Sequence, residues 1–170
     1  MSACPTCDSE VAAGSRWCTI CHSNVVDPSV GQLASPGKRF GAYILDLAIP
    51  ILAFFLILAS AGAAGSSASD PDQGLGFAVV IIFVLGFGYI IWALRLFTKG
   101  TTPGKSILGM YVVRESGERA TFGTMLFREW IGKWISGFVF GLGFLWILFD
   151  KDRQGWHDKL ASTYVVDGSS

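Results

Sequence analysis

The sequence predicts an all-α membrane protein with two full transmembrane helices, a third hydrophobic helical segment, a small cytoplasmic β element and an N-terminal zinc ribbon. Three observations lead to this prediction. The 170-residue chain is 51% hydrophobic and only 15% charged, whereas soluble domains carry about 25% charged residues. Two apolar runs are long enough to cross a bilayer. All four cysteines lie before residue 22, which indicates that they serve one local purpose.

Residues 1–26 form a small polar module that contains Cys4-x2-Cys7 and Cys18-x2-Cys21. Two such pairs provide four thiolates at the spacing of a structural, tetrahedral Zn²⁺ site. Because so small a module buries little apolar surface, metal binding would supply its folding free energy. Disulfides or redox dithiols are the alternative, but a cytoplasmic N-terminus keeps thiols reduced. Four cysteine ligands leave no open position, so the predicted role of the metal is structural.

Residues 27–36 lack periodicity and contain a proline near each end, which is typical of a linker. The membrane domain is predicted over residues 37–167. Its first helix, at about 40–62, lies in an apolar run whose only charged residue is Asp46. Its second helix, at about 75–97, begins with an uncharged run from residue 75 to residue 94. Both runs meet the length requirement for a membrane helix.

Charged residues orient the two helices. Lys and Arg stand before the first helix and recur over residues 98–120, whereas residues 62–74 are mildly acidic and contain no basic residue. The positive-inside rule therefore places the N-terminus and residues 98–120 in the cytoplasm. Residues 107–113 are β-prone and lead to a predicted hairpin turn at 115–118. Residues 162–166 are β-prone as well.

The third hydrophobic segment, at about 121–149, allows two interpretations. Residues 121–134 carry three charged side chains at helical spacing, which is typical of an interfacial amphipathic helix. The uncharged part, 135–149, is short for a crossing. A single span would place the C-terminus outside. A re-entrant hairpin that bends near 141–143 would keep the C-terminus inside, where its strand could join the strand at 107–113; we favour this second interpretation.

Asp46 is the most informative residue of the first helix. A carboxylate at the centre of a membrane helix costs about 2.5–3.5 kcal/mol on insertion scales. Arg39 precedes it by seven residues, and two helical turns place both residues on one stripe, roughly 10 Å apart. We therefore expect Arg39 to lean toward Asp46. Two roles stay open: the acid fixes helix packing, or it belongs to a pathway or site.

Several functional classes are excluded or disfavoured. A net charge of zero argues against nucleic-acid binding. Residues 100–106 resemble a phosphate loop, but Lys99 stands where that motif needs glycine, so a tight turn is predicted there. His157 beside Asp158 is more typical of a cap or surface contact than of a proton relay. With two histidines in the chain and no nucleophile–base set in sequence, we expect no enzymatic activity.

Three motifs occur in order along the chain. They are Arg39-Phe-Gly-Ala-Tyr-Ile-Leu-Asp46, the segment 101–113 with its Gly-Lys pair, and the segment 150–166 with Trp-His-Asp158. Together they resemble the RDD family of integral membrane proteins, named for an arginine and two aspartates. The resemblance covers residues 37–167 and implies that Asp46 and Asp158 are the two aspartates. It also implies an association with transport, including cation and proton exchange.

The N-terminal module resembles the zinc ribbons often fused to prokaryotic membrane proteins. Ribbons commonly have glycine after the second cysteine of each pair, but Asp8 and His22 stand there in this chain. The family and module together imply a small prokaryotic multi-pass protein of the cell (inner) membrane, whose partner is the lipid bilayer.

The leading hypothesis is transport or exchange of ions or small solutes through a polar cluster. We expect Asp46 to exchange the proton or cation, and Asp158 to pair with Lys105 or Arg128. The chain is small, so a path across the bilayer would need a homo-oligomer. The alternative is a membrane-anchored adaptor whose ribbon recruits a cytoplasmic protein. The residues expected in the cluster are Arg39, Asp46, Lys105, Arg128, His157 and Asp158.

Overall fold

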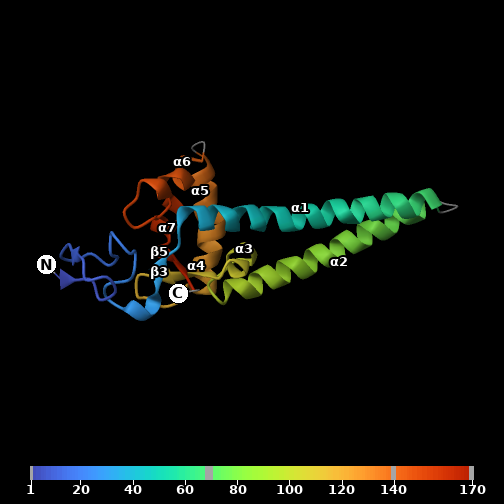
Figure 1. The fold of residues 1–170 in the computed structure, drawn as a ribbon. Helices are drawn as coiled ribbons and strands as arrows, with labels where there is room; N and C mark the ends of the chain where they lie inside the picture. Colours follow the sequence, from blue (N-terminus) through green and yellow to red (C-terminus); the bar gives the residue numbers. More distant parts are fainter. Residues whose placement is uncertain (1, 68–70, 139–140, 169–170) are drawn as a thin grey trace.

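The computed structural model describes residues 2–67, 71–138 and 141–168. A long hairpin of two helices, α1 (Pro36–Ser67) and α2 (Pro71–Phe97), extends away from a compact cap (Figure 1). Their parts Pro36–Ser60 and Val79–Phe97 are long and apolar enough to cross a membrane. They leave large apolar side chains exposed along their length, as lipid-facing helices do. The two predicted membrane helices are confirmed.

The first helix begins earlier than the predicted residue 40. Ser35 caps it, because its hydroxyl accepts a hydrogen bond from the Lys38 N–H at 3.2 Å. Pro36 follows at the first helical position, where its fixed φ is favourable and its missing N–H costs nothing. The two helices together take up the predicted acidic segment 62–74 except for residues 68–70, which lie outside the described residues.

A three-stranded antiparallel sheet lies at the open end of the hairpin, in the order β3 (Gln32–Leu33), β5 (Thr163–Asp167) and β4 (Met110–Arg114). Strand β3 precedes α1, β4 follows α2 and α3, and β5 follows α7. The sheet therefore gathers all three segments at one end of the hairpin. This confirms that the C-terminal strand joins the strand that follows the second membrane helix.

The segment predicted as a linker is ordered and belongs to the sheet. It contains a 3₁₀ helix at Pro28–Val30 and strand β3, in which Leu33 pairs with Val166. Two residues are too few for a strand to produce a visible alternation in the sequence. The interpretation of residues 27–36 as a linker between two separate modules is therefore corrected.

The predicted strand at 107–113 begins later in the structure, because a short helix, α3 (Pro103–Ile107), occupies its start. Thr102 caps this helix and Pro103 stands at its first position, so the predicted tight turn at 100–106 is a helical turn. The hairpin turn after β4 lies where expected, since the Arg114 N–H donates to the Glu118 carbonyl at 2.8 Å.

The third hydrophobic segment is bent. Its first part consists of α4 (Phe122–Leu126), a π-helix at Phe127–Gly132 and α5 (Lys133–Phe138). Its second part, α6 (Leu142–Leu145) and a 3₁₀ turn at Trp146–Leu148, departs at 107°. Gly141, with φ of +75°, begins the second part. The first part lies across the α1–α2 hairpin instead of along it (Figure 1). The segment therefore fits the bent-hairpin interpretation and not a straight span.

The chain then returns through α7 (Trp156–Leu160) to the central strand β5. Alternate residues of β5 face opposite sides of the sheet. Val165 belongs to the core shared with the membrane helices, which includes Ala42 and Met125. Its neighbours Tyr164 and Val166 belong to a second core on the other face.

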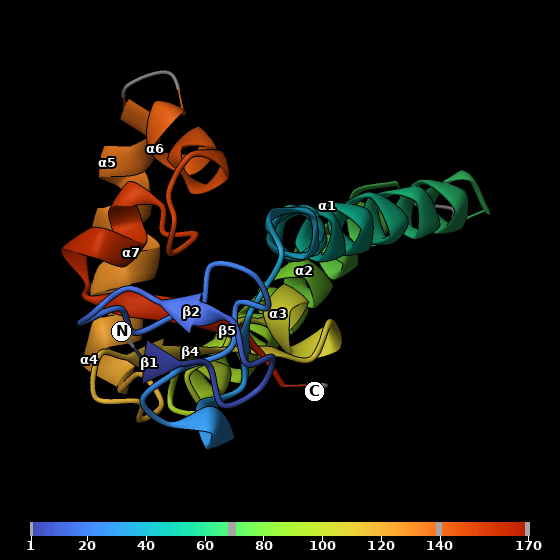
Figure 2. The same ribbon diagram turned by 60° about the vertical axis from the view of Figure 1, so that its left-hand side comes forward.

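The N-terminal module packs on that second face. It contains a small hairpin, β1 (Ser2–Ala3) with β2 (Glu10–Val11), at the end of the molecule farthest from the tip of the helix hairpin (Figures 1 and 2). A β-bridge between Ser23 and Gln32 joins the module to β3. Trp17 is buried, and its ring centroid lies 5.3 Å from that of Tyr164. The predicted separate module on a linker thus shares a hydrophobic core with the sheet, because its large aromatic residue requires a partner surface.

Candidate functional site

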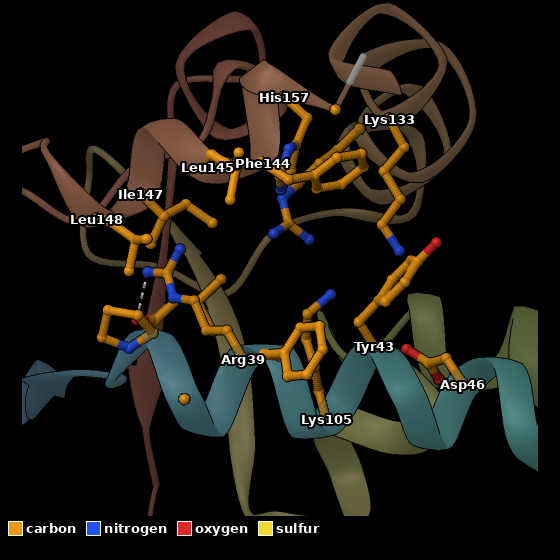
Figure 3. Close-up of a pocket in the computed structure, with 16 residues that line it drawn as sticks. Arg39, Tyr43, Asp46, Lys105, Lys133, Phe144, Leu145, Ile147, Leu148 and His157 are labelled. Atoms are coloured by element: carbon orange, nitrogen blue, oxygen red, sulfur yellow. Dashed lines mark hydrogen bonds between the residues drawn. The ribbon is translucent and has the colours of Figure 1, made fainter. Parts of the chain in front are cut away.

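A pocket of about 610 Å³ lies between the start of α1 and the bend formed by α5 and α6 (Figure 3). Four basic residues line it, which we call the basic wall: Arg39, Lys105, Arg128 and Lys133. Asp46 is the acidic residue of the lining. Aromatic and aliphatic side chains of the bend line the side opposite the start of α1 (Figure 3). The apolar members of the lining include Phe40, Phe144, Leu145, Ile147, Leu148 and Val165.

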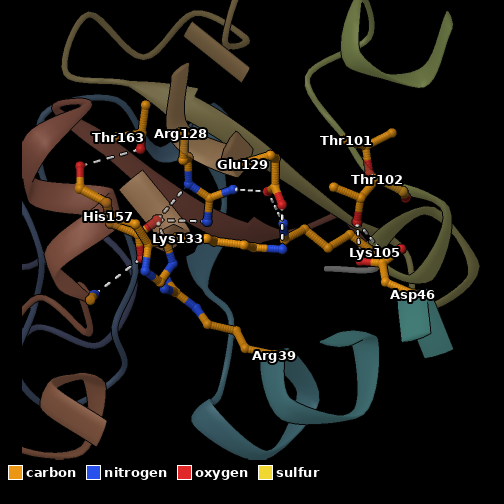
Figure 4. Close-up of polar contacts among 12 residues, drawn as sticks. Arg39, Asp46, Thr101, Thr102, Lys105, Arg128, Glu129, Lys133, His157 and Thr163 are labelled. Carbon is orange, nitrogen blue, oxygen red and sulfur yellow. Dashed lines mark hydrogen bonds and ion pairs between the residues drawn. The ribbon is translucent and has the colours of Figure 1, made fainter. Parts of the chain in front are cut away.

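Behind the basic wall, opposite charges alternate in a chain of buried ion pairs (Figure 4). Asp158 receives Arg39 Nη1 at 2.9 Å and Arg128 Nη2 at 2.6 Å. Glu129 receives Arg128 Nη1 at 2.6 Å and Lys105 Nζ at 2.7 Å, and it also contacts Lys133. We call these residues the polar cluster. It links α1, α3, the π-helix, α5 and α7.

Arg39 does not pair with Asp46. Its guanidinium donates to Asp158 and, at 3.1 Å, to the carbonyl of Val165 in β5. Arg39 lies in the first turn of α1, beside the sheet, and α7 brings a fully buried carboxylate within its reach. The expectation that Arg39 leans along the helix toward Asp46 is therefore wrong. A buried acid next to a second arginine is the better partner, because burial strengthens the attraction between charges.

Asp46 instead holds the start of α3. Its carboxylate accepts hydrogen bonds from the Thr102 hydroxyl and the Gly104 N–H, each at 2.7 Å. A Cβ atom on Gly104 would lie 2.1 Å from the Ala42 carbonyl oxygen. Glycine is required here because α3 rests directly on the backbone of α1. The Gly-Lys motif of the sequence therefore positions a donor for Asp46.

Asp158 is the most buried acid of the site, with no exposed surface. Burial alone would raise its pKa, but Arg128, His157 and Arg39 outweigh burial and hold the pKa well below its usual range. The Gly155 N–H also donates to it at 3.1 Å. Of the two predicted partners of Asp158, Arg128 is confirmed and Lys105 is not, since Lys105 pairs with Glu129.

Burial changes the pKa values of Lys105 and His157, the two remaining residues of the predicted cluster. Burial lowers the pKa of Lys105 to about 8, although Glu129 opposes the shift. Burial lowers the pKa of His157 to about 4 and outweighs the attraction of Asp158, 3.7 Å away. His157 is thus neutral at pH 7, and its Nδ1 lies 3.3 Å from the Ser136 hydroxyl.

Ser136, His157 and Asp158 resemble the parts of a hydrolytic triad, a set that the sequence did not suggest. Ser136 is fully buried, and its hydroxyl accepts a hydrogen bond from the backbone N–H of His157 at 3.1 Å. A Cβ atom on Gly143 would lie 2.6 Å from the Ser136 Cα, so the bend packs tightly over the serine. The arrangement joins α5 to α7 without leaving the hydroxyl open to a substrate.

Sequence reasoning missed Glu129, which joins Lys105 and Arg128. The available signal was an adjacent pair of opposite charges, Arg128-Glu129, within an apolar segment. The structure places both in a π-helix, a rare form found frequently at functional sites. Ordinary helical periodicity would direct two adjacent side chains toward different sides.

The four cysteines form a cluster that fits a metal ion. Their Sγ atoms lie within 4.8 Å of one another, with Cys4 and Cys21 at 3.6 Å and Cys7 and Cys18 at 3.7 Å. Four sulfurs placed tetrahedrally at about 2.3 Å from a metal ion are about 3.8 Å apart. The cluster therefore has the dimensions of a tetrathiolate site.

The two halves of the cysteine cluster have the same local fold. The Asp8 N–H donates to the Cys4 carbonyl at 2.9 Å, and the His22 N–H donates to the Cys18 carbonyl at 3.1 Å. Asp8 and His22 both have φ of +57°. These are the positions where ribbons commonly carry glycine, and the left-handed conformation explains that preference.

Comparison with known proteins shows which family the membrane region matches. Residues 33–162 match the RDD family. YxaI of Bacillus subtilis is 30% identical over 142 residues, which cover 75% of this chain and 93% of that protein. YckC of the same organism is 27% identical over 75% of this chain and 80% of its own length.

A proline-rich antigen homolog of Mycobacterium tuberculosis is 34% identical over 89 residues, which cover 51% of this chain and 37% of that protein. No solved structure matches the chain. The family match spans most of the chain and contains every residue of the polar cluster. The chain belongs to the RDD family.

Proposed function

We propose that this RDD protein is a multi-pass protein of the bacterial plasma membrane that exchanges ions or small solutes through its polar cluster. The observation that carries the proposal is the line of alternating buried charges at one end of a membrane hairpin, next to an acid inside the first span. Buried ion pairs are poor devices for stability alone, because desolvation offsets much of their attraction. A functional demand is the better explanation for several of them together.

Two features of the cluster suit exchange. Lys105, with a pKa of about 8, can change its charge near neutral pH, which couples the cluster to protons. Asp46, on α1, lines the same pocket as Lys105 and binds the start of the helix that carries Lys105. We propose that Asp46 takes the cation or proton and that Lys105 responds to the resulting change in charge.

The proposed orientation follows from the basic residues. Lys38 and Arg39 lie in the first turn of the first span, and Arg95 and Lys99 lie at the end of the second and just after it, so the cap would face the cytoplasm. The pocket lies at that end of the hairpin, and α1 and α2 expose apolar side chains along their length. A path across the bilayer would therefore run between copies in a homo-oligomer.

Flux measurements test this proposal. Asp46→Asn keeps the size of the side chain and one acceptor oxygen, but it removes the charge. In proteoliposomes loaded with a pH-sensitive dye, we expect Asp46→Asn to abolish cation-dependent proton movement that the unaltered protein supports. Glu118→Gln, at an exposed position of the cap, is the matched control and should retain flux. Equal flux from folded Asp46→Asn and unaltered protein would remove Asp46 from the mechanism.

We propose Zn²⁺ as the ion of the cysteine cluster. Thiolate ligands in a tetrahedral arrangement select zinc among the common divalent ions. All four positions would be filled by protein ligands, so the ion would stabilise the ribbon and would not take part in a reaction.

The buried Ser136 hydroxyl supports a role without enzymatic activity, because a substrate could not reach it.

An adaptor role is the second candidate, because the ribbon presents apolar side chains to the outside. Ile20, between the cysteines of the second pair, is 69% exposed, and it could contact a cytoplasmic protein. Removing residues 1–30 would uncover Tyr164, so a point change is a cleaner test. Ile20→Ser should abolish the cellular phenotype under the adaptor role and leave it unchanged under exchange.

A further inference from the structure

We propose that the pocket between α1 and the bend binds one anionic glycerophospholipid of the surrounding bilayer. The acidic headgroup would lie against the basic wall, and an acyl chain would lie along the apolar wall of α6 and the following 3₁₀ turn. Lipid binding is a separate property from the exchange activity proposed above, although Asp46 and Lys105 line the same pocket. It requires only that the hairpin spans a membrane.

The first support is the position of the pocket along the membrane normal. Trp130 and Trp134 are 69% and 76% exposed and lie on the helix that runs across the hairpin (Figure 1). Exposed tryptophans are typical of the headgroup region of a membrane. The charged residues of the same helix, Arg128 and Glu129, are turned inward to the polar cluster. The pocket borders this helix and therefore lies at the level of the lipid phosphates.

The second support is the charge of the pocket wall. Four of the lining residues are basic and one, Asp46, is acidic. The two carboxylates of the polar cluster, Glu129 and Asp158, stand behind the arginine and lysine side chains and do not line the pocket. The charged groups that line the pocket are therefore mainly cationic. A phosphodiester complements it.

The third support is an unsatisfied donor. Arg39 lines the pocket, is 7% exposed, and its Nε has no hydrogen-bond partner among the described residues. Its Nη atoms are already used by Asp158 and the Val165 carbonyl. A buried N–H group without an acceptor is costly, and a phosphate oxygen is an acceptor of the right charge.

The apolar wall decides between a lipid and a free anion. Phe144, Leu145 and Leu148 lie across the pocket from Arg39 and Lys105 (Figure 3), and Leu145 and Leu148 are exposed. A small anion such as phosphate would leave this wall in contact with water. An acyl chain would cover it, so the two walls together select an amphiphile with an acidic head.

Native mass spectrometry of the full chain in detergent micelles tests the proposal without any flux measurement. Dioleoylphosphatidylglycerol is the anionic probe, dioleoylphosphatidylcholine the neutral one, and inorganic phosphate the headgroup alone. We expect one retained phosphatidylglycerol, bound at least about fivefold more tightly than phosphatidylcholine, since each basic residue near an anionic lipid contributes about that factor. Phosphate alone should not compete. Equal affinity for the two lipids would overturn the proposal, and competition by phosphate would identify a free anion as the ligand.

Two variants locate the site. Lys133→Gln removes one charge of the basic wall and should reduce the preference for phosphatidylglycerol about fivefold, whereas Lys99→Gln, exposed at the same end of the hairpin but outside the pocket, should not. Leu148→Gln should weaken both lipids. A folded Lys133→Gln that keeps the full preference would overturn the assignment. If Lys133→Gln does not fold, unchanged lipid binding in Leu148→Gln would overturn it.

Discussion

The Arg39 guanidinium and the Asp158 carboxylate form a buried ion pair at 2.9 Å, although 119 positions of the chain separate them. This pair ties the first turn of the first membrane helix to the short helix before the last strand. Arg128 binds the second oxygen of the same carboxylate at 2.6 Å. Asp158 therefore joins the hairpin, the third hydrophobic segment and the sheet.

The first prediction concerns the loss of this carboxylate charge. Asp158→Asn leaves Arg39 and Arg128 buried beside a neutral amide, so we expect the free energy of unfolding to fall by about 3–5 kcal/mol. Thermal unfolding in micelles, followed by size-exclusion chromatography, measures the change. Glu118→Gln is the control at an exposed position and should lie within about 0.5 kcal/mol of the unaltered chain. A loss below 1 kcal/mol for Asp158→Asn would contradict a central role for Asp158.

The second prediction concerns acid sensitivity. In the unfolded chain His157 binds a proton below about pH 6.5, but burial lowers its pKa to about 4 in the folded chain. Unfolding between pH 4 and 6.5 therefore takes up a proton, and acid favours the unfolded state. His157 should make stability fall with decreasing pH in this window, by at most about 1.4 kcal/mol per pH unit.

The His157→Gln variant isolates this effect, because carboxylates that titrate in the same range are common to both proteins. Unfolding midpoints measured from pH 4.5 to 7.5 should show a weaker pH dependence for His157→Gln than for the unaltered chain. Parallel curves for the two proteins would mean that the pKa of His157 is the same in the folded and the unfolded chain, and would contradict the prediction.

The third prediction concerns the contact between α3 and α1. Gly104→Ala would place a Cβ atom 2.1 Å from the Ala42 carbonyl oxygen, a backbone atom that cannot move without bending α1. We expect a loss of about 2–3 kcal/mol or more. Gly123→Ala is the matched control, because no atom lies within 4 Å of its added methyl group, and it should be neutral or slightly stabilising. Similar stability of the two variants would rule out the close approach of the helices.

The fourth prediction concerns the metal. Elemental analysis of the purified full chain should find one zinc ion per chain, and Cys18→Ser should abolish it. Removing the ion with a chelator should release Trp17 from Tyr164 and increase hydrogen exchange in β5, whereas α2 should keep its protection. Unchanged exchange in β5 after complete removal of zinc would show that the ribbon does not support the sheet.

Short sequence patterns were sufficient to predict the elements whose formation depends on residues close together in the sequence. The helix ending at Phe97, the cysteine pairs and the strands near residues 110 and 165 follow from apolar length, ligand spacing and β-propensity, each of which is written within a short segment. The bend near Gly141 was predicted for the same reason, because an uncharged run of that length is too short to cross a bilayer.

The partners of the charged residues depended on the tertiary structure. Arg39 and Asp46 share one helical stripe, yet Arg39 binds Asp158 and Asp46 binds the start of α3. Glu129 and the strand at Gln32–Leu33 were missed because neither is recognisable without its distant partners. Hydrophobicity is a property of a segment and can be read along the chain. An ion pair is set by distance and burial, and only the packed fold brings the two charges together away from water.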